Sequence, residues 1–364
     1  MASRVYLDAN ASEKLRPEAR AALLAALAAD ANPASVHAAG RGARAMLEGA
    51  RDSLARRFGA HPARVVFTSG GAEANALAIH ALGEGRRLVV SAIEHDSVLA
   101  AAPGAAILPV DGEGVARLGA LPALLAQGPA LVCLMAANNE TGAIQPIAEA
   151  AAICRAHGAK LHVDAVQAAG RMPLDLATLG ADSLALSGHK LGGPQGAGAL
   201  IFAADPPVRP LVPGGGQERG MRGGTPALPA IAGMAAAAEL EPPDLAPLRD
   251  EAARAAVARG AVVVAAGAPR LANTLCLALP GVAAATQVMA LDLAGIAVSA
   301  GAACSSGKVA ASHVLAAMGL GALAGEAIRV SLPWDATAAD IAGFAAAYAA
   351  MADRVARRAA QPSP

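Results

Sequence analysis

Three groups of polar residues stand where apolar runs of the sequence end. Asp164 ends the run Lys160-Leu-His-Val-Asp164, and Ser187-Gly-His-Lys190 follows the next apolar run. Thr68-Ser-Gly-Gly71 follows an earlier run and opens a helical pattern. If these runs are strands of an open α/β sheet, ligands bind at their carboxyl ends. We therefore expect an acid, a lysine and a glycine-rich turn to meet at one edge of a sheet.

Together these groups match what an enzyme that uses pyridoxal 5'-phosphate (PLP) needs. The lysine can hold the cofactor covalently, and a buried acid can keep its ring nitrogen protonated so that the ring accepts electrons. Free N–H groups at a helix start can bind the phosphate. Each element alone is a weak signal, since a glycine-rich turn is most often only a turn and a lysine is usually solvated. The combination is much more specific than its parts.

The cysteines fall into two kinds. All four stand far apart without a Cys-x-x-Cys pair, so a metal site or a disulfide framework is poorly supported: Cys133, Cys154, Cys276 and Cys304. Cys133 and Cys276 lie inside apolar runs, which predicts that they pack in the core. Cys304 lies in Gly301-Ala-Ala-Cys-Ser-Ser-Gly307, and small residues of this kind are typical of an exposed, reactive thiol on a mobile loop.

The elements that must position these residues alternate from about residue 40 onward. Continuous apolar runs predict buried strands of a parallel sheet covered on both faces, at 64–68, 87–91, 130–134, 160–164 and 182–187. Apolar residues at helical spacing predict cover helices over 43–58 and 146–157. Alternation of this kind favours an α/β architecture with right-handed crossovers.

The second half of the chain predicts a smaller C-terminal α/β domain. Residues 208–229 are rich in Gly and Pro and predict a long functional loop, and 239–244 predict a linker. Beyond the linker, strands are expected near 261–265, 274–279 and 327–332, and helices near 284–293, 312–318 and 336–358. We assign residues 14–240 to a large domain, and 1–13 with 241–364 to a small domain that carries the Cys304 loop.

Composition limits the classes of protein that fit. Of the 364 residues 55% are hydrophobic and 16% are charged, which argues against long disordered tracts. The 29 basic and 29 acidic residues balance and form no Lys/Arg run, so we expect neither a nucleic acid nor a membrane as partner. The first residues lack a charged and apolar leader, so we expect a soluble, cytoplasmic protein.

With these residues in view, the sequence resembles the PLP-dependent cysteine desulfurases, nearly from end to end. The motifs that carry the resemblance occur in the family's order: Tyr6-Leu-Asp-Ala-Asn-Ala11, Asn32-Pro-Ala-Ser-Val-His37, Phe67-Thr-Ser-Gly70, Glu94-His-Asp-Ser-Val98, Asn138-Asn-Glu-Thr-Gly142, His162-Val-Asp-Ala-Val-Gln167, Ser187-Gly-His-Lys190, Gly214-Gly-Gly-Gln-Glu218, Arg222-Gly-Gly-Thr225, Ala303-Cys304 and Ser312-His-Val-Leu315. The resemblance implies a class V aminotransferase-like homodimer of PLP fold-type I. Its large domain would hold a mostly parallel seven-stranded sheet.

The resemblance also implies a role for each matching residue. Lys190 would hold PLP, Asp164 would pair with the ring nitrogen, and Gln167 would hydrogen-bond the ring hydroxyl. His95 would stack on the ring and move protons; from the residues alone it could equally be a capping residue. Cys304, in the longer loop type of the family, would take sulfur from L-cysteine and pass it to a partner. The phosphate would be bound by Gly71, Ala72, Ser187 and His189, with Thr225 of the other subunit, and the substrate carboxylate by Asn139 and Arg329.

Some alternatives stay open. A selenocysteine lyase, or another class V lyase or aminotransferase, would share the PLP residues. Gly301 to Lys308 fails the pattern of a nucleotide-binding loop, because Val309 replaces the Ser or Thr that would bind magnesium. Ala72 stands where the family usually has Thr, which removes one hydrogen bond worth about 1–2 kcal/mol. The sulfur acceptor is left open among iron–sulfur scaffold proteins, for housekeeping or for nitrogenase, and tRNA thiolation factors.

Overall fold

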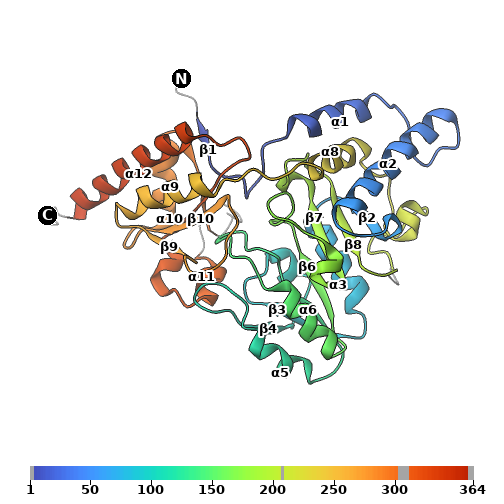
Figure 1. The fold of residues 1–364 in the computed structure, drawn as a ribbon, viewed down its shortest axis with the longest axis horizontal. Coiled ribbons are helices and arrows are strands. Elements are labelled where there is room, and N and C mark those ends of the chain that lie inside the picture. Colours follow the sequence, from blue (N-terminus) through green and yellow to red (C-terminus); the bar gives the residue numbers. More distant parts are fainter. Residues whose placement is uncertain (1–3, 206–208, 302–310, 360–364) are drawn as a thin grey trace.

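Seven strands form the larger sheet of this computed structural model, which describes residues 4–205, 209–301 and 311–359. Their order across the sheet is β2-β8-β7-β6-β5-β3-β4 (Figure 1). The strands are β2 (Val65–Thr68), β3 (Arg87–Ser91), β4 (Ala106–Leu108), β5 (Ala130–Cys133), β6 (Lys160–Asp164), β7 (Ser183–Ser187) and β8 (Gly198–Phe202). Only β8 is antiparallel to its neighbours, β2 and β7. The prediction of a mostly parallel seven-stranded sheet is confirmed.

Alternate residues of these strands pack on opposite faces of the sheet. On one face, Val132 and Leu184 join a core with α2 (Ala38–Arg57) and α6 (Ile147–Ala156). On the other face, Leu131 and Ala185 join a core with α3 (Gly71–Gly83). Because both faces are covered, the strands are apolar without interruption, and this is why the sequence pattern identified five of them. It missed β4, which has three residues, and β8, which follows a glycine-rich segment.

Further helices surround the larger sheet. They are α1 (Pro17–Leu27), α4 (Asp96–Leu99), α5 (Leu121–Leu125), α7 (Leu176–Leu179) and α8 (Leu228–Ala238). α1 packs against α8, and α8 against α2, at the end of the molecule away from the C-terminal sheet (Figure 1). The predicted cover helices at 43–58 and 146–157 correspond to α2 and α6.

A second, antiparallel sheet is built from the C-terminal part of the chain. Its order is β12-β13-β10-β9, from β9 (Val262–Val264), β10 (Thr274–Ala278), β12 (Ser299–Ala300) and β13 (Ala327–Ser331). The helices of this part are α9 (Ala246–Val257), α10 (Ala284–Leu293), α11 (His313–Ala317) and α12 (Ala338–Ala359). β1 (Val5–Tyr6) pairs with β11 (Ile296–Ala297), which ties the start of the chain to this part. The smaller α/β unit is as predicted, and the boundaries 14–240 and 241–364 stay a prediction.

The direction of the strands places several loops at one edge of the larger sheet. β3, β5, β6 and β7 are parallel, and β2 runs the same way because both it and β7 are antiparallel to β8. The segments that follow these five strands therefore meet at the same edge. Gly198 allows this at the β2 end, since a Cβ there would lie 2.5 Å from the carbonyl carbon of Gly70. This edge is where the candidate site lies.

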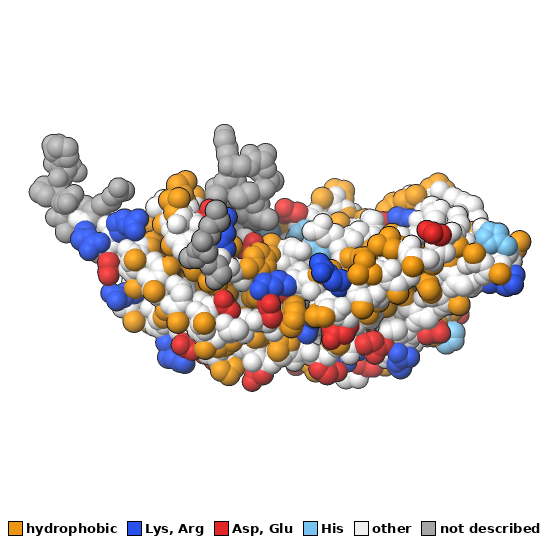
Figure 2. Space-filling model, turned by 90° about the horizontal axis from the view of Figure 1, so that it is seen from above, with side chains coloured by type: hydrophobic (Ala, Val, Ile, Leu, Met, Phe, Trp, Pro, Cys, Tyr) orange, Lys and Arg blue, Asp and Glu red, His pale blue; other side chains and the backbone are white. Residues whose placement is uncertain are grey.

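The outer surface of the described residues carries both signs of charge. In Figure 2, acidic and basic side chains are interspersed among apolar ones over the described part of the face that is seen. Among the described helices, none is both long enough and apolar enough to span a membrane.

Candidate active site

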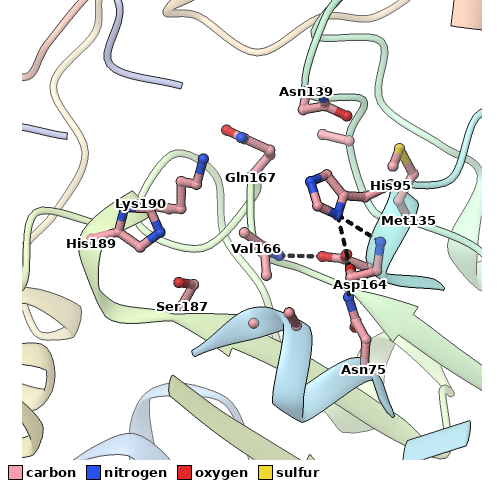
Figure 3. A pocket seen from close by; sticks show the side chains of 14 residues that line it. Asn75, His95, Met135, Asn139, Asp164, Val166, Gln167, Ser187, His189 and Lys190 are labelled. Carbon is pink, nitrogen blue, oxygen red and sulfur yellow. Dashed lines mark hydrogen bonds between the residues drawn. The ribbon is translucent and has the colours of Figure 1, made fainter. Parts of the chain in front are cut away.

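A cavity of about 220 Å³ opens at the carboxyl edge of the larger sheet. Nine of the twelve residues predicted from the sequence line it: Gly71, Ala72, His95, Asn139, Asp164, Gln167, Ser187, His189 and Lys190. Figure 3 shows Lys190 and His189 on one side and His95 and Asn139 on the opposite side, with Asp164 close to His95. Thr225 and Arg329 lie outside the cavity lining, and Cys304 lies outside the described residues.

Asp164 at the end of β6 is held by two donors. Its Oδ1 accepts from the backbone N–H of Val166 at 2.9 Å, and its Oδ2 accepts from Asn75 Nδ2 at 2.7 Å. Burial raises the pKa of Asp164, while these two hydrogen bonds oppose that rise. The buried carboxylate is thus fixed in place with its charge only partly compensated. A cationic ring nitrogen in the cavity would complete its environment.

A chain of hydrogen bonds fixes Asn75 behind Asp164. Because a carboxylate only accepts, Asn75 must turn its NH₂ group to Asp164 and its oxygen to His162 Nε2, which is 3.0 Å away. His162 Nδ1 lies 2.8 Å from the hydroxyl of Ser183. Burial lowers the pKa of His162 to about 3, so the ring is neutral and donates from Nε2. Sequence reasoning missed Asn75, which lies on α3 and is 89 residues from Asp164.

Lys190 points into the cavity from the short 3₁₀ helix Gly188–Lys190 that follows β7. Its ammonium donates to the backbone oxygens of Asn10 at 2.5 Å and Ala11 at 3.0 Å. Burial, and then the nearby charges of Arg329 and Arg171, lower the pKa of Lys190 to about 8. A sizeable fraction of the amine is therefore neutral near neutral pH. This is the form that attacks a carbonyl carbon.

The part of the cavity near Ser187 and His189 can hold an anion. α3 begins at Gly71, and the first N–H groups of a helix have no partner within it. The Ser187 hydroxyl lies beside this helix start (Figure 3). Burial lowers the pKa of His189 to about 4, so its ring is neutral there. Gly71 is needed at the helix start, because a Cβ there would lie 2.6 Å from Val166 Cγ2.

His95 caps a helix and also lines the cavity. Its Nδ1 accepts from the backbone N–H of Ser97 at 3.1 Å and lies 2.9 Å from the Ser97 hydroxyl, so it caps the start of α4. The same ring lines the cavity opposite Lys190 (Figure 3). Capping fixes the orientation of the ring, with Nε2 left free to move a proton.

Arg329, on β13, lies behind Asn139. Its guanidinium donates to Asp8 Oδ1 at 2.8 Å and to the backbone oxygen of Asn139 at 3.1 Å. Its Nε is buried and has no partner among the described residues. The arginine thus joins the small unit to the loop that carries Asn139, and its Nε–H is an unused donor. Its contact with a substrate carboxylate stays a prediction.

Thr225 lies outside this cavity, at the end of the 208–229 segment. Arg222 in the same segment binds Glu73 at 2.8 Å, and Glu73 also accepts from the N–H of Ser69 at 2.8 Å. Thr225 lines a separate hollow that includes Ser69 and Arg222. This placement leaves Thr225 available to a second copy of the chain, and that role stays a prediction.

Glu94, beside His95, is fully buried. Its Oε1 accepts from the N–H of Met135 at 2.7 Å, and its Oε2 has no partner among the described residues. Burial, and then the charge of Asp164, raise the pKa of Glu94 to about 8. The carboxyl group is therefore mainly protonated at neutral pH. Sequence reasoning quoted Glu94 only as part of a motif and gave it no role.

This protonation predicts a pH dependence of stability. The folded protein keeps the Glu94 proton up to about pH 8, whereas the unfolded chain loses it near 4.5, so the free energy of unfolding falls as pH rises through this window. The full shift corresponds to at most about 5 kcal/mol. Glu94→Gln cannot ionise, so urea denaturation at a series of pH values should show a flatter profile than the wild type. The exposed Glu149→Gln is the control, and an equal slope in all three proteins would contradict the assignment.

The residues that line the cavity fit PLP. The cavity combines an anion cradle at the start of α3, a buried carboxylate beneath its centre and a lysine of lowered pKa facing it. The uncompensated burial of Asp164 is the observation that favours a cationic ring nitrogen over a neutral ligand. Among the described residues no group of three or more His, Cys, Asp or Glu side chains could hold a metal ion.

Comparison with known proteins supports the same interpretation of the site. The family model described as Aminotransferase class-V matches residues 5–344. A cysteine desulfurase of Cereibacter sphaeroides is 40% identical over 359 residues, with 93% of each chain covered. An IscS-like cysteine desulfurase of Mycobacterium tuberculosis is 36% identical, over 92% of this chain and 93% of its own length. The X-ray structure of a NifS-like protein from Rickettsia africae aligns with a TM-score of 0.89 at 34% identity, covering 96% of this chain and 99% of that one. The predicted fold is confirmed by this likeness.

Proposed function

The chain belongs to the class V aminotransferase family, and we propose that it is a cysteine desulfurase that converts L-cysteine to L-alanine and leaves the sulfur on Cys304 as a persulfide. The observation that carries the proposal is that Lys190 and Asp164 line the same cavity. Similarity to cysteine desulfurases over 93% of the chain supports it. The sulfur then supplies iron–sulfur cluster assembly or another thio-cofactor.

The cofactor is PLP, which when bound supplies an electron sink for the carbon atoms of the substrate. Lys190 holds it covalently, and Asp164 accepts a hydrogen bond from its ring nitrogen. The N–H groups of Gly71 and Ala72, with Ser187 and His189, bind its phosphate. Because Asp164 is fixed by Val166 and Asn75, it keeps its carboxylate aimed at one position in the cavity.

Two residues move protons at the substrate. The Lys190 amine, when free, would take the proton from the α-carbon, and its pKa of about 8 suits this exchange near neutral pH. His95, across the cavity, exchanges protons through Nε2 while Ser97 keeps Nδ1 engaged. The two groups lie on opposite sides of the cavity, so they can serve different atoms of the substrate (Figure 3).

Cys304 takes the sulfur. Its thiolate attacks the sulfur of cysteine, and the carbon–sulfur bond breaks with its electron pair going to carbon. The carbon that loses sulfur receives a proton, the α-carbon regains the proton that Lys190 took, and alanine leaves. The thiol of the enzyme becomes a persulfide, and no external oxidant or reductant is needed. The partner that receives this sulfur is an iron–sulfur scaffold or another acceptor protein.

Arg329 and Asn139 bind the carboxylate of the substrate. Asp8 and the backbone of Asn139 hold the guanidinium in place and leave Nε as an unused donor. Arg329→Lys keeps the charge but loses the planar pair of donors. We expect KM for L-cysteine to rise by about 10- to 100-fold, in line with about 1.5–3 kcal/mol for a charged hydrogen bond, and kcat to change less. Steady-state kinetics checks this, and an unchanged KM would remove Arg329 from the substrate site.

The working form is a cytoplasmic homodimer in which Thr225 of one subunit completes the phosphate site of the other. The position of Thr225 outside its own cavity supports this arrangement. We expect neither a nucleic acid nor a membrane as a partner of this dimer.

One experiment separates this function from its main alternatives. The purified protein is supplied with L-cysteine, with L-selenocysteine, or with L-alanine and a keto acid, and the products are quantified. A desulfurase gives alanine from cysteine with one sulfur per alanine. Alanine from selenocysteine alone would indicate a selenocysteine lyase, and transfer of the amino group to the keto acid would indicate an aminotransferase.

A further inference from the structure

Arg171 is a buried cation that neither the sequence motifs nor the proposed reaction uses. It lies on the turn after β6, and its side chain is 6% exposed. Its guanidinium donates to the backbone oxygens of Gln167 and Ala9, each at 3.1 Å, and to the side-chain Oε1 of Gln167. The carboxylate of Glu13 lies 4.0 Å away, and Nε has no partner among the described residues. The oxygens that accept hydrogen bonds from this guanidinium are therefore all neutral.

The guanidinium decides how the amide of Gln167 is turned. Arginine has only donors, so it must face the oxygen of this amide and not the NH₂ group. Gln167 Nε2 then donates one hydrogen to the backbone oxygen of Asn10 at 3.0 Å. Gln167 lines the cavity, and its second N–H hydrogen is left for a ligand there. With the amide reversed, Gln167 would offer the cavity an acceptor in place of a donor.

We propose that Arg171 is a positioning residue that fixes the amide of Gln167 with its N–H toward the cavity and adds a positive charge behind it, so that the site stabilises a negatively charged oxygen on the cofactor ring. This inference rests on the proposed function for the identity of the cofactor. It assigns to Arg171 a role that acts through Gln167 and the local electric field, without contact to the substrate.

The charges of the site agree with this role. Burial lowers the pKa of Arg171 to about 10, which still leaves it protonated at neutral pH. The charge of Arg171 also contributes to the lowered pKa of Lys190 and of His189. The carboxylates that face the turn are Glu13, at 4.0 Å, and Asp164 and Asp8, which act on Lys190. Among the described residues, Glu13 is the carboxylate that pairs with Arg171, and at 4.0 Å it balances the charge only in part, so the field of Arg171 reaches the cavity.

The test is a pH titration of the visible absorbance of the bound cofactor in the holoenzyme. A nearby positive charge and an N–H donor both favour the more negative form of a titrating group, so both lower its pKa. Arg171→Met removes both effects and should raise the midpoint of the titration by about one unit or more. Arg171→Lys keeps the charge and loses the forked contact with Gln167, so its midpoint should rise less. Arg155→Met, which removes an exposed arginine of α6, should leave the midpoint unchanged.

A double-mutant cycle separates the action through Gln167 from the charge alone. In a Gln167→Ala background, Arg171→Lys should give no further shift, because the amide that it positions is gone. If Arg171→Met does not fold, Arg171→Lys and this cycle still test whether Arg171 acts through Gln167. An unmoved midpoint in both Arg171 variants, or additive shifts in the cycle, would overturn the proposal. The titration needs no cysteine, so a protein that binds the cofactor without releasing alanine would fail the proposed function and not this inference.

Discussion

Lys190→Ala is expected to abolish the visible absorbance of the bound cofactor and to lower alanine formation by at least about a thousandfold. The variant removes the amine that we propose holds the cofactor and takes the α-proton. Among the described residues, no other lysine lines the cavity to replace it. The measurement is an absorbance spectrum of the purified protein after incubation with PLP and gel filtration, followed by quantification of alanine from L-cysteine.

Lys160→Ala is the matched control, because β6 begins at Lys160 and ends at Asp164. Lys160 pairs with Asp182 at 2.8 Å at the far end of the strand from the cavity. This variant should keep both the absorbance and the activity. Turnover at the wild-type rate by Lys190→Ala would contradict the assignment of Lys190.

Cys304→Ala is expected to keep the cofactor absorbance and to lose all sulfide and persulfide formation. The reason is that the other thiols cannot substitute for it. Cys133, Cys154 and Cys276 are at most 1% exposed, and burial raises the pKa of each, that of Cys154 to about 12. A protonated, buried thiol is a poor nucleophile. Alkylation with a thiol reagent and mass spectrometry of the peptide that holds residue 304 measures the persulfide.

The matched control here is Cys154→Ala, which removes a thiol from α6 in the core. It should cost some stability through lost packing, and it should leave persulfide formation intact. Normal sulfide release by Cys304→Ala would remove Cys304 from the reaction and leave only the PLP chemistry of the cavity.

Five strands of the larger sheet, and the place of Asp164 and Lys190, could be predicted because their signals are local. Asp164 and Lys190 each follow an apolar run, and the carboxyl ends of parallel strands share one edge. Strand direction alone was therefore enough to predict that Asp164 and Lys190 lie at the same edge of the sheet. The fold class followed from the same alternation of runs and helical patterns.

The contacts that tune the site could not be predicted, because most of them join distant parts of the chain. Asn75 reaches Asp164 across 89 residues, and Arg329 reaches Asp8 across 321. The protonation of Glu94 depends on complete burial beside Asp164, which no sequence pattern encodes. Arg171 is four residues from Gln167, yet its role depends on the lack of a close carboxylate.

Thr225 shows a different limit. Its predicted partner is the phosphate site of a second subunit, and in its own chain it lines a separate hollow. In a mixed dimer of a Thr225→Ala chain and a Lys190→Ala chain, one site would keep both Lys190 and Thr225 and the other site would lose both.

The most direct measurement is an absorbance spectrum of the purified protein before and after L-cysteine is added, with alanine quantified in the same sample. We predict a visible cofactor band that shifts on addition of cysteine, with alanine formed in an amount equal to the sulfur that is released or bound to Cys304. A colourless protein after incubation with PLP, or a yellow protein that yields no alanine from cysteine, would contradict the account.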